Sequence, residues 1–507
     1  MDISDRRILA LWFPRLPTDR LQRRCASPDD IPLIIARKED NALRLYAVDA
    51  KAAKLKLAPG MPLADARARI PALNVVEADE PADAKLLNAI ADWCERYTPL
   101  VALDTPHGLL LDVTGTTHLF DGERALLNQI RKALAKLGFA VRGAIAGSAA
   151  AARALAHYAD GTIAPPQREA ETIAPLPIAA LNLDYAITHG LRRAGLKTIG
   201  QVASRTRPEL TSRFGKQMVF LLDHALGKIE KPISPRRAIP DFLAEHRFAE
   251  PIATQDVIEA SISSLAKNIT AMLEKHGQGA RRMEATFFRA DGAVHRIAIE
   301  TGAPVREPAI VERLFRERLA SLHDPLDPGF GFDLIRLCAD KAERMKPETI
   351  GFDANDNIDK EIAFLTDRLS ARFGSHRVLR FQPQDTHIPE AEAVTIPAQQ
   401  ARPQSWKRNE QRRPLRLFAK PEPIEAMAEV PDGPPLRFRW RRALHSVARA
   451  EGPERIAMEW WRHQETIPTR DYFRVEDREG RRFWLYRDGL YDRETDHPRW
   501  FVHGVFA

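Results

Sequence analysis

The sequence predicts a modular protein built from α/β and α+β domains rather than one core. Its 507 residues exceed the roughly 100–200 residues of one domain. Apolar runs alternate with amphipathic segments over residues 8–158, which is typical of an α/β layer. A wholly helical pattern follows, and residues 401–507 hold six of the eight tryptophans. These shifts in pattern predict several domains that end in a small β-rich one.

Composition limits the class of protein. Lys and Arg number 76 against 69 Asp and Glu, a net charge of +7, and 44% of residues are hydrophobic, which excludes global disorder. A mild basic excess suits nucleic acid without proving it. Cys25, Cys94 and Cys338 are odd in number and far apart, so we expect neither a disulfide framework nor a zinc site. We find no apolar stretch long enough to cross a membrane and no signal-peptide pattern, so we expect a cytoplasmic protein without membrane contact.

The first domain, expected over residues 1–170, takes its elements from hydrophobic periodicity. Short apolar runs bounded by Pro, Gly or polar residues predict strands, and spacings of three and four predict helices. The turn at 59–62, with the sequence PGMP, divides one helical segment in two. The predicted strands are 8–13, 32–36, 108–114 and 141–146, and the predicted helices lie within 51–70, 86–97, 124–137 and 148–158.

Further boundaries follow from changes in composition. Glycines separate short helices in a helical module at residues 171–238, and strands mix with long helices in an α+β domain at residues 239–345. A connecting helix is expected within 346–382. Ten prolines lie in residues 383–435, which predicts an extended linker. Aromatic strands between polar turns then predict a small β-rich domain at residues 436–507.

The usual nucleotide-binding and hydrolase signatures do not occur. Instead, PGMPLADARARIPAL at 59–73 and LDVTG at 111–115 stand between the predicted strands, and the glycine-punctuated helical module follows. In this order and spacing, residues 5–345 resemble the Y-family translesion DNA polymerases of the UmuC and DinB type. The resemblance implies a palm and fingers at 1–170, a thumb at 171–238 and a little-finger-like domain at 239–345.

The family transfers nucleotides with two metal ions, which need carboxylate ligands. Its first Asp falls on Phe13 here, within one residue, and neither Trp12 nor Phe13 can bind a metal. Its Asp-Glu pair falls on His107 and Gly108. The resemblance therefore implies a degenerate catalytic site that lacks its metal ligands.

The triphosphate positions are altered as well. The Tyr and Arg of the fingers fall on Ala50 and Ala53, and the Asn-Lys of a later palm strand falls on Ser148 and Ala149. Alanine can neither neutralise nor hydrogen-bond a phosphate oxygen. We therefore expect a polymerase fold that no longer polymerises, with no cofactor and no bound metal.

Two rival interpretations stay open. In one, the chain is an active error-prone polymerase in which Asp49, Asp104 or Asp112 holds the metals. Against it, Asp112 also suits the capping of the turn at Gly115, and Asp19 and Asp49 suit surface or capping positions. In the other, the chain is a structural DNA-binding protein unrelated to replication, which would lack affinity for a sliding clamp.

The C-terminal segment has motifs of its own, among them GPERIAMEWW at 452–461 and GRRFWLYRDGLY at 480–491. They are similar to the end domain of a noncatalytic branch of the family, found in a bacterial damage-inducible mutagenesis cassette. The resemblance implies a scaffold that links the sliding clamp, a RecA-like partner and an error-prone replicative-type polymerase. Aromatic side chains are the candidate partner-binding residues, with single-strand binding as the runner-up: Trp460, Trp461, Tyr472, Phe473 and Trp484.

Contact with DNA is expected to survive the loss of catalysis. The segment 191–200, LRRAGLKTIG, has the turn of a helix-hairpin-helix, whose backbone N–H groups and nearby cations meet phosphates. Arginines on the strands of the following domain could line a duplex. The candidate DNA-binding residues are Arg193, Gly195, Lys197, Thr198, Gly200, Arg281, Arg282 and Arg289, with Arg296 beside them.

Clamp binding usually needs a short extended peptide that ends in paired hydrophobic residues. The segment 414–418, PLRLF, has that ending in Leu415, Leu417 and Phe418, but it lacks Gln at the proper first position. A second, degenerate candidate is 348–352, with Ile350 and Phe352. The alternative interpretation of the first candidate is that Leu417 and Phe418 dock on a neighbouring domain.

Overall fold

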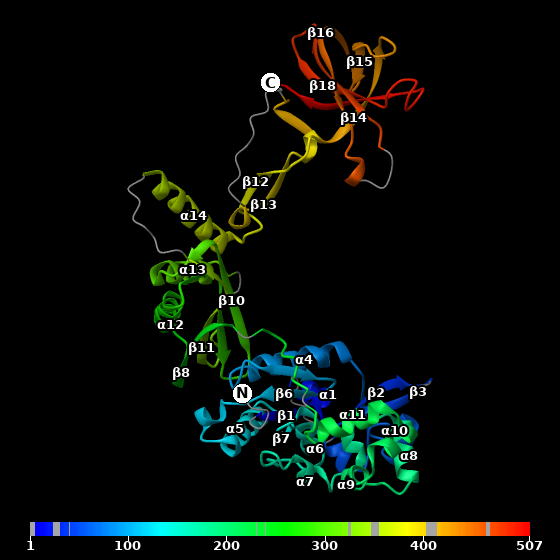
Figure 1. The fold of residues 1–507 in the computed structure, drawn as a ribbon, viewed down its shortest axis with the longest axis vertical. Coiled ribbons are helices and arrows are strands. Elements are labelled where there is room, and N and C mark those ends of the chain that lie inside the picture. The colour runs from blue at the N-terminus through cyan, green and yellow to red at the C-terminus, as the bar shows by residue number, and fades with distance from the viewer. Residues whose placement is uncertain are drawn as a thin grey trace. The chain divides into compact units, whose positions relative to one another are not determined.

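The computed structural model contains two compact units (Figure 1). The first is Met1–Ile299 with Pro304–Thr349, and the second is Glu300–Ala303 with Ile350–Ala507. Each unit is described by itself. The structure describes residues 6–23, 31–39, 41–229, 231–238, 240–322, 326–345, 354–401, 413–462 and 467–506.

The first sheet of the first unit has the strand order β5-β6-β1-β7. Its neighbouring strands are antiparallel. Because successive side chains point to opposite faces, Leu9 and Leu11 join one apolar cluster while Ile8 and Ala10 join another. Both faces are thus buried, as the apolar runs predict. The elements are β1 (Ile8–Trp12), β5 (Val101–Asp104), β6 (Gly108–Asp112), β7 (Arg142–Ala146), α4 (Glu80–Cys94), η2 (Thr117–Phe120), α5 (Glu123–Lys136) and α6 (Ala149–Tyr158).

A smaller sheet, in the order β3-β2-β4, carries the segment with the PGMP turn. The predicted helix, turn and helix are confirmed, and Gly60 adopts a φ of +86° in the turn. Strand β3 was not predicted, since its polar and apolar residues alternate less regularly. The elements are α1 (Leu16–Gln22), β2 (Leu33–Glu39), β3 (Ala42–Val48), α2 (Ala50–Lys54), α3 (Leu63–Arg69) and β4 (Asn74–Glu77).

The expected helical module packs its apolar residues into the same cluster as α6 and one face of the first sheet. Gly195 and Gly215 adopt positive φ angles of +78° and +86° between helices, a conformation that glycine adopts easily. The elements are α7 (Glu169–Ile173), η3 (Ile178–Leu181), α8 (Tyr185–Arg193), α9 (Ile199–Ala203), α10 (Arg207–Phe214) and α11 (Lys216–Ala225).

The second sheet of the first unit has the order β10-β9-β11-β8. The long helix α12 contacts β8, β9 and β11, and α13 packs beside α12. This mixture of strands and long helices is the one expected for an α+β domain at residues 239–345. The elements are β8 (Phe242–Ile252), α12 (Gln255–Lys275), β9 (Gln278–Arg289), β10 (Val294–Val305), α13 (Pro308–Ala320) and β11 (Phe332–Arg344).

The second unit contains a helix, a two-stranded sheet and a closed six-stranded barrel. The predicted connecting helix is α14 (Ala354–Phe373), and β12 (Leu379–Pro383) pairs with β13 (Ala393–Pro397). Short 3-10 helices are η4 (Pro389–Ala391), η5 (Ala398–Gln400) and η6 (Trp460–Arg462). The barrel strands are β14 (Arg416–Ala428), β15 (Pro435–Trp440), β16 (Ala443–Ile456), β17 (Arg470–Asp477), β18 (Arg482–Asp488) and β19 (Arg499–Val505).

The barrel corrects the expected linker at 383–435. Strand β14 lies inside that range, so the barrel begins at Arg416 rather than near 436. Two of the prolines, Pro421 and Pro423, belong to β14, whose pairing with β19 shifts register between Leu417 and Glu422. Proline is tolerated in strands at such irregularities, which is why proline content alone misled the prediction.

Candidate functional site

The candidate site lies where β1 ends and β6 begins. Trp12 pairs with Gly108 across these strands, and the N–H of Phe13 donates to the carbonyl of His107 at 2.8 Å. The side chain of Phe13 is fully buried in the apolar cluster, edge-on to Phe139 at 6.1 Å. The side chain of Phe13 thus points into the core, and its assignment to the place of the first Asp, made within one residue, stays a prediction. Trp12 occupies the position beside Gly108.

Aromatic rings and imidazoles surround this position. Trp12 stacks on His157 of α6, with ring centroids 4.1 Å apart, and the Nε2 of His107 lies 3.2 Å from the hydroxyl of Tyr46. Burial lowers the pKa of both His107 and His157. Both imidazoles are thus largely neutral at pH 7, so they bring little charge to this end of the sheet.

The three carboxylates named as alternative metal ligands have other partners. Asp104 forms an ion pair with Arg153 of α6. Asp49 caps α2 by accepting from the N–H of Ala52 at 2.7 Å, and it also accepts from Gln22. Asp112 accepts from the N–H of Thr114 at 3.0 Å, as the capping interpretation predicts. Among the described residues, no group of three or more His, Cys, Asp or Glu is placed to hold a metal ion.

Asp19, expected at a surface or capping position, is not at the surface. It is only 6% exposed, and its Oδ2 accepts from the N–H of Ala140 at 2.8 Å. Burial raises the pKa of Asp19 to about 6, although the hydrogen bond and two nearby arginines oppose this shift. Asp19 thus ties α1 to the segment before β7.

The three alanines at the expected triphosphate positions lie in two different helices. Ala50 and Ala53 lie in α2, which Asp49 caps. Ala149 begins α6, which follows the end of β7. In β7, Arg142 pairs with Trp12, whereas Ala146 pairs with Ile8. Ala149 therefore lies at the end of the first sheet opposite to Trp12, and its assignment to a triphosphate position stays a prediction.

The helix-hairpin-helix candidate lies between α8 and α9. Arg193, Gly195 and Lys197 are exposed there. Thr198 caps α9 in a capping box, and the side chain of Gln201 accepts from the N–H groups of Lys197 and Thr198 at 2.7 and 3.3 Å. A phosphate would have to compete with this amide oxygen for the same donors.

Gly200 has a packing role at the same hairpin. Its N–H donates to the carbonyl of Ala174 at 2.9 Å, and a Cβ at this position would lie 3.1 Å from that oxygen. Gly200 thus allows α9 to pack closely on α7, and this packing role takes the place of the expected contact with DNA.

The arginines of the second sheet already have acidic partners. Arg281 pairs with Glu343 at 3.3 Å, Arg282 with Asp340 at 2.5 Å, and Arg289 with Asp291 at 2.6 Å. Arg289 is also paired with Asp327 at 3.0 Å. These carboxylates offset the positive charge that a duplex would meet, so the second sheet is a weaker DNA candidate than the hairpin.

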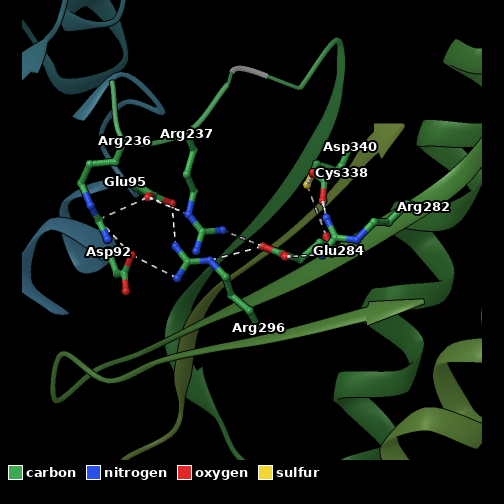
Figure 2. A network of polar contacts seen from close by, with 9 residues as sticks. All are labelled: Asp92, Glu95, Arg236, Arg237, Arg282, Glu284, Arg296, Cys338 and Asp340. Carbon is green, nitrogen blue, oxygen red and sulfur yellow. Dashed lines mark hydrogen bonds and ion pairs between the residues drawn. The ribbon is translucent and has the colours of Figure 1, made fainter. Parts of the chain in front are cut away.

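Figure 2 shows a polar network that joins the end of α4 to the second sheet. Glu95, which follows α4, pairs with Arg296 of β10 at 2.7 Å. Arg296 also contacts Asp92 at 3.1 Å and Glu284 of β9 at 3.3 Å. Arg236 lies 2.9 Å from Asp92, and Arg237 lies 3.2 Å from Glu284. Sequence periodicity showed none of these pairs, because their members are far apart in the chain.

A pocket of about 440 Å³ opens beside this network. Arg237, Arg282, Glu284 and Cys338 are among its lining residues. The Sγ of Cys338 lies 3.1 Å from Asp340 (Figure 2), and burial raises the pKa of the Cys338 thiol. The thiol is thus protonated at neutral pH and unreactive.

The first clamp candidate does not form a free peptide in this fold. Leu417 pairs with Gly504 in the barrel, and Phe418 stacks on Trp440 with ring centroids 6.1 Å apart. Leu415, just before β14, is 86% exposed. The structure thus agrees with docking of Leu417 and Phe418 on a folded domain. The second candidate, with Ile350 and Phe352, lies outside the described residues.

The aromatic candidates of the C-terminal segment fall into two groups. Tyr472, Phe473 and Trp484 are at most 2% exposed and belong to the barrel core. Their proposed role at a partner surface is wrong, because a partner cannot reach them. Trp460 and Trp461 are 79% and 61% exposed, with ring centroids 5.7 Å apart.

Two site residues were missed although the sequence carries a signal for them. Arg153 and His157 are the polar residues within the otherwise apolar AAAARALAHY segment that forms α6. Their spacing of four places them on one helix face. That face meets β1 and β5, where Arg153 pairs with Asp104 and His157 stacks on Trp12.

Comparison with known proteins places the fold in a family. Residues 19–157 match the impB/mucB/samB family, and residues 241–351 match the C-terminal domain of that family. These domains, on the strand order described above, define a protein with the fold of a Y-family DNA polymerase. Protein ImuB of Caulobacter vibrioides is 41% identical over 462 residues, which cover 89% of this chain and 100% of the relative. The chain belongs to the ImuB family.

More distant relatives match over shorter stretches. DNA polymerase IV of Dehalococcoides mccartyi is 27% identical over 271 residues, 52% of this chain and 68% of the relative. The crystal structure of DinB from Sulfolobus solfataricus is 16% identical, covering 67% of this chain and 100% of that one, with a TM-score of 0.40.

None of the helices in the described part of the chain has the length and apolar character to cross a membrane.

Proposed function

We propose that this chain is a noncatalytic scaffold of translesion synthesis. It would bind damaged primer-template DNA without reading sequence. It would also link the sliding clamp, a RecA-like partner and an error-prone replicative-type polymerase during damage-induced mutagenesis. Membership of the ImuB family supports this proposal, and no cofactor enters it. A cytoplasmic location stays a prediction.

The main support for a noncatalytic role comes from the side chains at the junction of β1 and β6. Two metal ions need converging carboxylate oxygens. Here Trp12 stacks on His157, and the Nε2 of His107 contacts Tyr46. Asp104, which pairs with Gly108 across β5 and β6, forms an ion pair with Arg153 that offsets its charge. An aromatic and imidazole lining of this kind cannot hold two divalent cations near a triphosphate.

Primer extension by the purified full chain tests the noncatalytic role. The wild-type chain is compared with D104N and D112N variants, first in Mg²⁺ and then in Mn²⁺, while primer-template binding is followed by fluorescence anisotropy. We expect binding without extension. Extension that disappears in D104N or D112N would establish the rival active polymerase. Extension that survives in both variants and disappears in a D49N variant would assign the metals to Asp49 instead. Extension that survives in all three variants identifies a contaminating enzyme, which further purification removes.

DNA binding is assigned first to the hairpin between α8 and α9. Arg193, Gly195 and Lys197 are exposed together there, which suits a phosphate backbone. The arginines of the second sheet are assigned mainly to ion pairs with their acidic neighbours. Binding that is equal for unrelated sequences and falls steeply with salt would support contact through phosphates.

For the clamp contact, the segment 348–352 is preferred over 414–418. The reason is that Leu417 and Phe418 already pack in the barrel. Clamp binding by the full chain is compared between an I350A/F352A variant and an L415A variant. We expect the first variant to lose binding and the second to keep it. The reverse result would assign the contact to Leu415 and its neighbours.

Partner recruitment is assigned to Trp460 and Trp461 on η6. Exposed Trp side chains are frequent hot spots of protein interfaces, but they also stack on bases. A W460A/W461A variant is titrated with the RecA-like partner, with the polymerase and with single-stranded DNA. Loss of protein binding supports recruitment. Loss of single-strand binding alone would replace it with the second function.

A further inference from the structure

The outside of the barrel carries a row of arginines along strand β15. Phe438 of this strand is buried in the barrel core, whereas Arg437 and Arg439 on either side of it are exposed. Because successive side chains of a strand point to opposite faces, both arginines lie on the outer surface of the barrel, about 7 Å apart along the strand. The outer surface of β15 is therefore positively charged.

Neighbouring segments add to this charge. Ser446 of β16 is the register partner of Arg437, and its carbonyl accepts from the backbone N–H of Arg478 at 3.1 Å. Arg449 is exposed on β16 three residues beyond Ser446, and Arg442 is exposed where β15 ends. These five exposed arginines are here named the barrel arginine face: Arg437, Arg439, Arg442, Arg449 and Arg478.

Nothing in the described part of the chain holds most of these guanidinium groups. Arg439 approaches Glu425 of β14 at 4.0 Å, and because both side chains are more than half exposed, this pair contributes little. The side chains of the other four arginines form no hydrogen bond or ion pair with any described residue. The arginines of the second sheet, by contrast, are paired with carboxylates. The barrel arginine face is thus available to an anionic partner.

The tip of the hairpin between β15 and β16 holds two arginines in a conformation that favours glycine. Arg441 and Arg442 form the loop between Trp440 and Ala443, which pair in register, and their φ angles are +48° and +68°. Two-residue loops with positive φ at both positions usually contain Asn-Gly, since larger side chains are strained there. Glu422 holds Arg441 in an ion pair of 2.5 Å, but no described residue holds the side chain of Arg442. Strain of this kind is typical of functional sites.

The composition of the barrel arginine face indicates which anion fits. Arginine binds phosphate oxygens through paired N–H groups, and interfaces with DNA are much more positively charged than those between proteins. Single-strand binding needs exposed aromatic rings, which β15 does not supply, because Phe438 is buried and Trp440 stacks on Phe418. Protein interfaces usually have aromatic anchors at their centre as well. The face therefore fits a duplex better than a single strand or an acidic protein.

We propose that the barrel arginine face binds the phosphate backbone of double-stranded DNA without reading its sequence. This is a second DNA contact, on a different unit from the hairpin between α8 and α9. It rests on the proposed function only in that the chain works on DNA. Because phosphate contacts carry no sequence information, duplex affinity at this face depends on salt concentration and is equal for unrelated sequences.

Fluorescence anisotropy of a blunt duplex with the full chain, at several salt concentrations, tests the proposal. We expect R437Q/R442Q to reduce affinity about tenfold and to lower the slope of log affinity against log salt by about 2. R377Q/R380Q is the matched control, since Arg377 and Arg380 are exposed in the same unit but lie outside the barrel. It removes the same charge and should leave duplex binding unchanged. Circular dichroism checks that each variant is folded.

Removal of a neighbouring carboxylate gives a test that misfolding cannot imitate. Glu425 is 84% exposed beside Arg439, so its charge repels a phosphate backbone on this face. E425Q should therefore tighten duplex binding about threefold at low salt. L444A tests the apolar alternative, because Leu444 is exposed opposite Arg439, and it should not change duplex affinity. Unchanged or weaker binding by E425Q, or a loss in L444A, would overturn the proposal.

The failure of this inference can be told apart from the failure of the proposed function. Duplex binding that R193A/K197A weakens and R437Q/R442Q leaves unchanged would overturn the inference alone and keep the hairpin contact. A wild-type chain that binds no DNA at low salt would overturn both assignments. If R437Q/R442Q lost only single-strand binding, or only binding to a protein partner, the duplex would be the wrong occupant of this face.

Discussion

Glu95 and Arg296 are 201 residues apart in the sequence, yet their side chains form an ion pair of 2.7 Å between the end of α4 and strand β10. Glu95 also meets Arg236 at 3.7 Å and Arg237 at 3.8 Å. The side chains of Glu95 and Arg296 are 11% and 15% exposed, so salt screens their attraction only weakly. This network holds the palm-like sheet and the little-finger-like sheet together.

Removal of Glu95 should destabilise the first unit. E95A would remove one carboxylate partner from three arginines, which keep their contacts with Asp92 and Glu284. The loss of these charged hydrogen bonds is expected to lower the free energy of unfolding by about 2 kcal/mol. The matched control is E80A on the same helix, because Glu80 pairs with Arg37 at an exposed site. Chemical denaturation of the full chain measures both. Equal effects of the two variants would contradict the importance of the buried network.

Neutral substitutions in the hairpin should weaken DNA binding more than those in the second sheet. R193A and K197A together are expected to reduce affinity about tenfold and to lower the slope of log affinity against log salt by about 2. R289A is the control, because Arg289 is paired with Asp291 and Asp327. Fluorescence anisotropy at several salt concentrations measures the slope. A larger loss in R289A would move the interface to the second sheet.

Restoring a carboxylate at Gly108 should damage the fold. A Cβ there would lie 2.8 Å from the carbonyl oxygen of Asp104, so β5 must shift to make room. We expect G108E to lower the free energy of unfolding by about 2 kcal/mol. H107D loses the contact with Tyr46 and should lower the free energy of unfolding by only about 1 kcal/mol. Thermal denaturation compares the two variants. If G108E proved as stable as the wild type, the close approach of β5 would be wrong.

The raised pKa of Asp19 predicts that the stability of the fold depends on pH. Its pKa is about 6 in the folded chain against an ordinary value of 3.8, so the folded state holds this proton more tightly than the unfolded state. Stability from Asp19 is complete below about pH 4 and is lost as the pH rises through about 6. D19N should remove this dependence and raise the free energy of unfolding at pH 7.5 by about 3 kcal/mol.

Denaturation of D19N and wild type between pH 4 and pH 8 measures this effect, with D65N on the exposed side of α3 as the control. The Asn side chain keeps an acceptor for the N–H of Ala140, so packing is preserved. Parallel pH profiles of D19N and the wild type would show that Asp19 does not titrate in this range.

Local pattern in the sequence was sufficient for much of the fold. Apolar runs predicted β1 and β6, periodicity predicted α5 and α12, and motif order indicated the polymerase family. Strand β14 was missed because its prolines resemble those of a linker. Pairing with β19 overrides that local preference, and pairing between segments so far apart cannot be read from either segment alone.

The candidate site shows the same division between local and long-range information. The sequence by itself determined that no carboxylate stands at 12, 13, 107 or 108, since residue identity needs no fold. Only the tertiary structure decided that Trp12 lies beside Gly108 while Phe13 turns into the core, and that Tyr472 is buried while Trp460 is exposed. The physical reason is that burial and ion pairing depend on neighbours brought from distant parts of the chain, as Glu95 and Arg296 demonstrate.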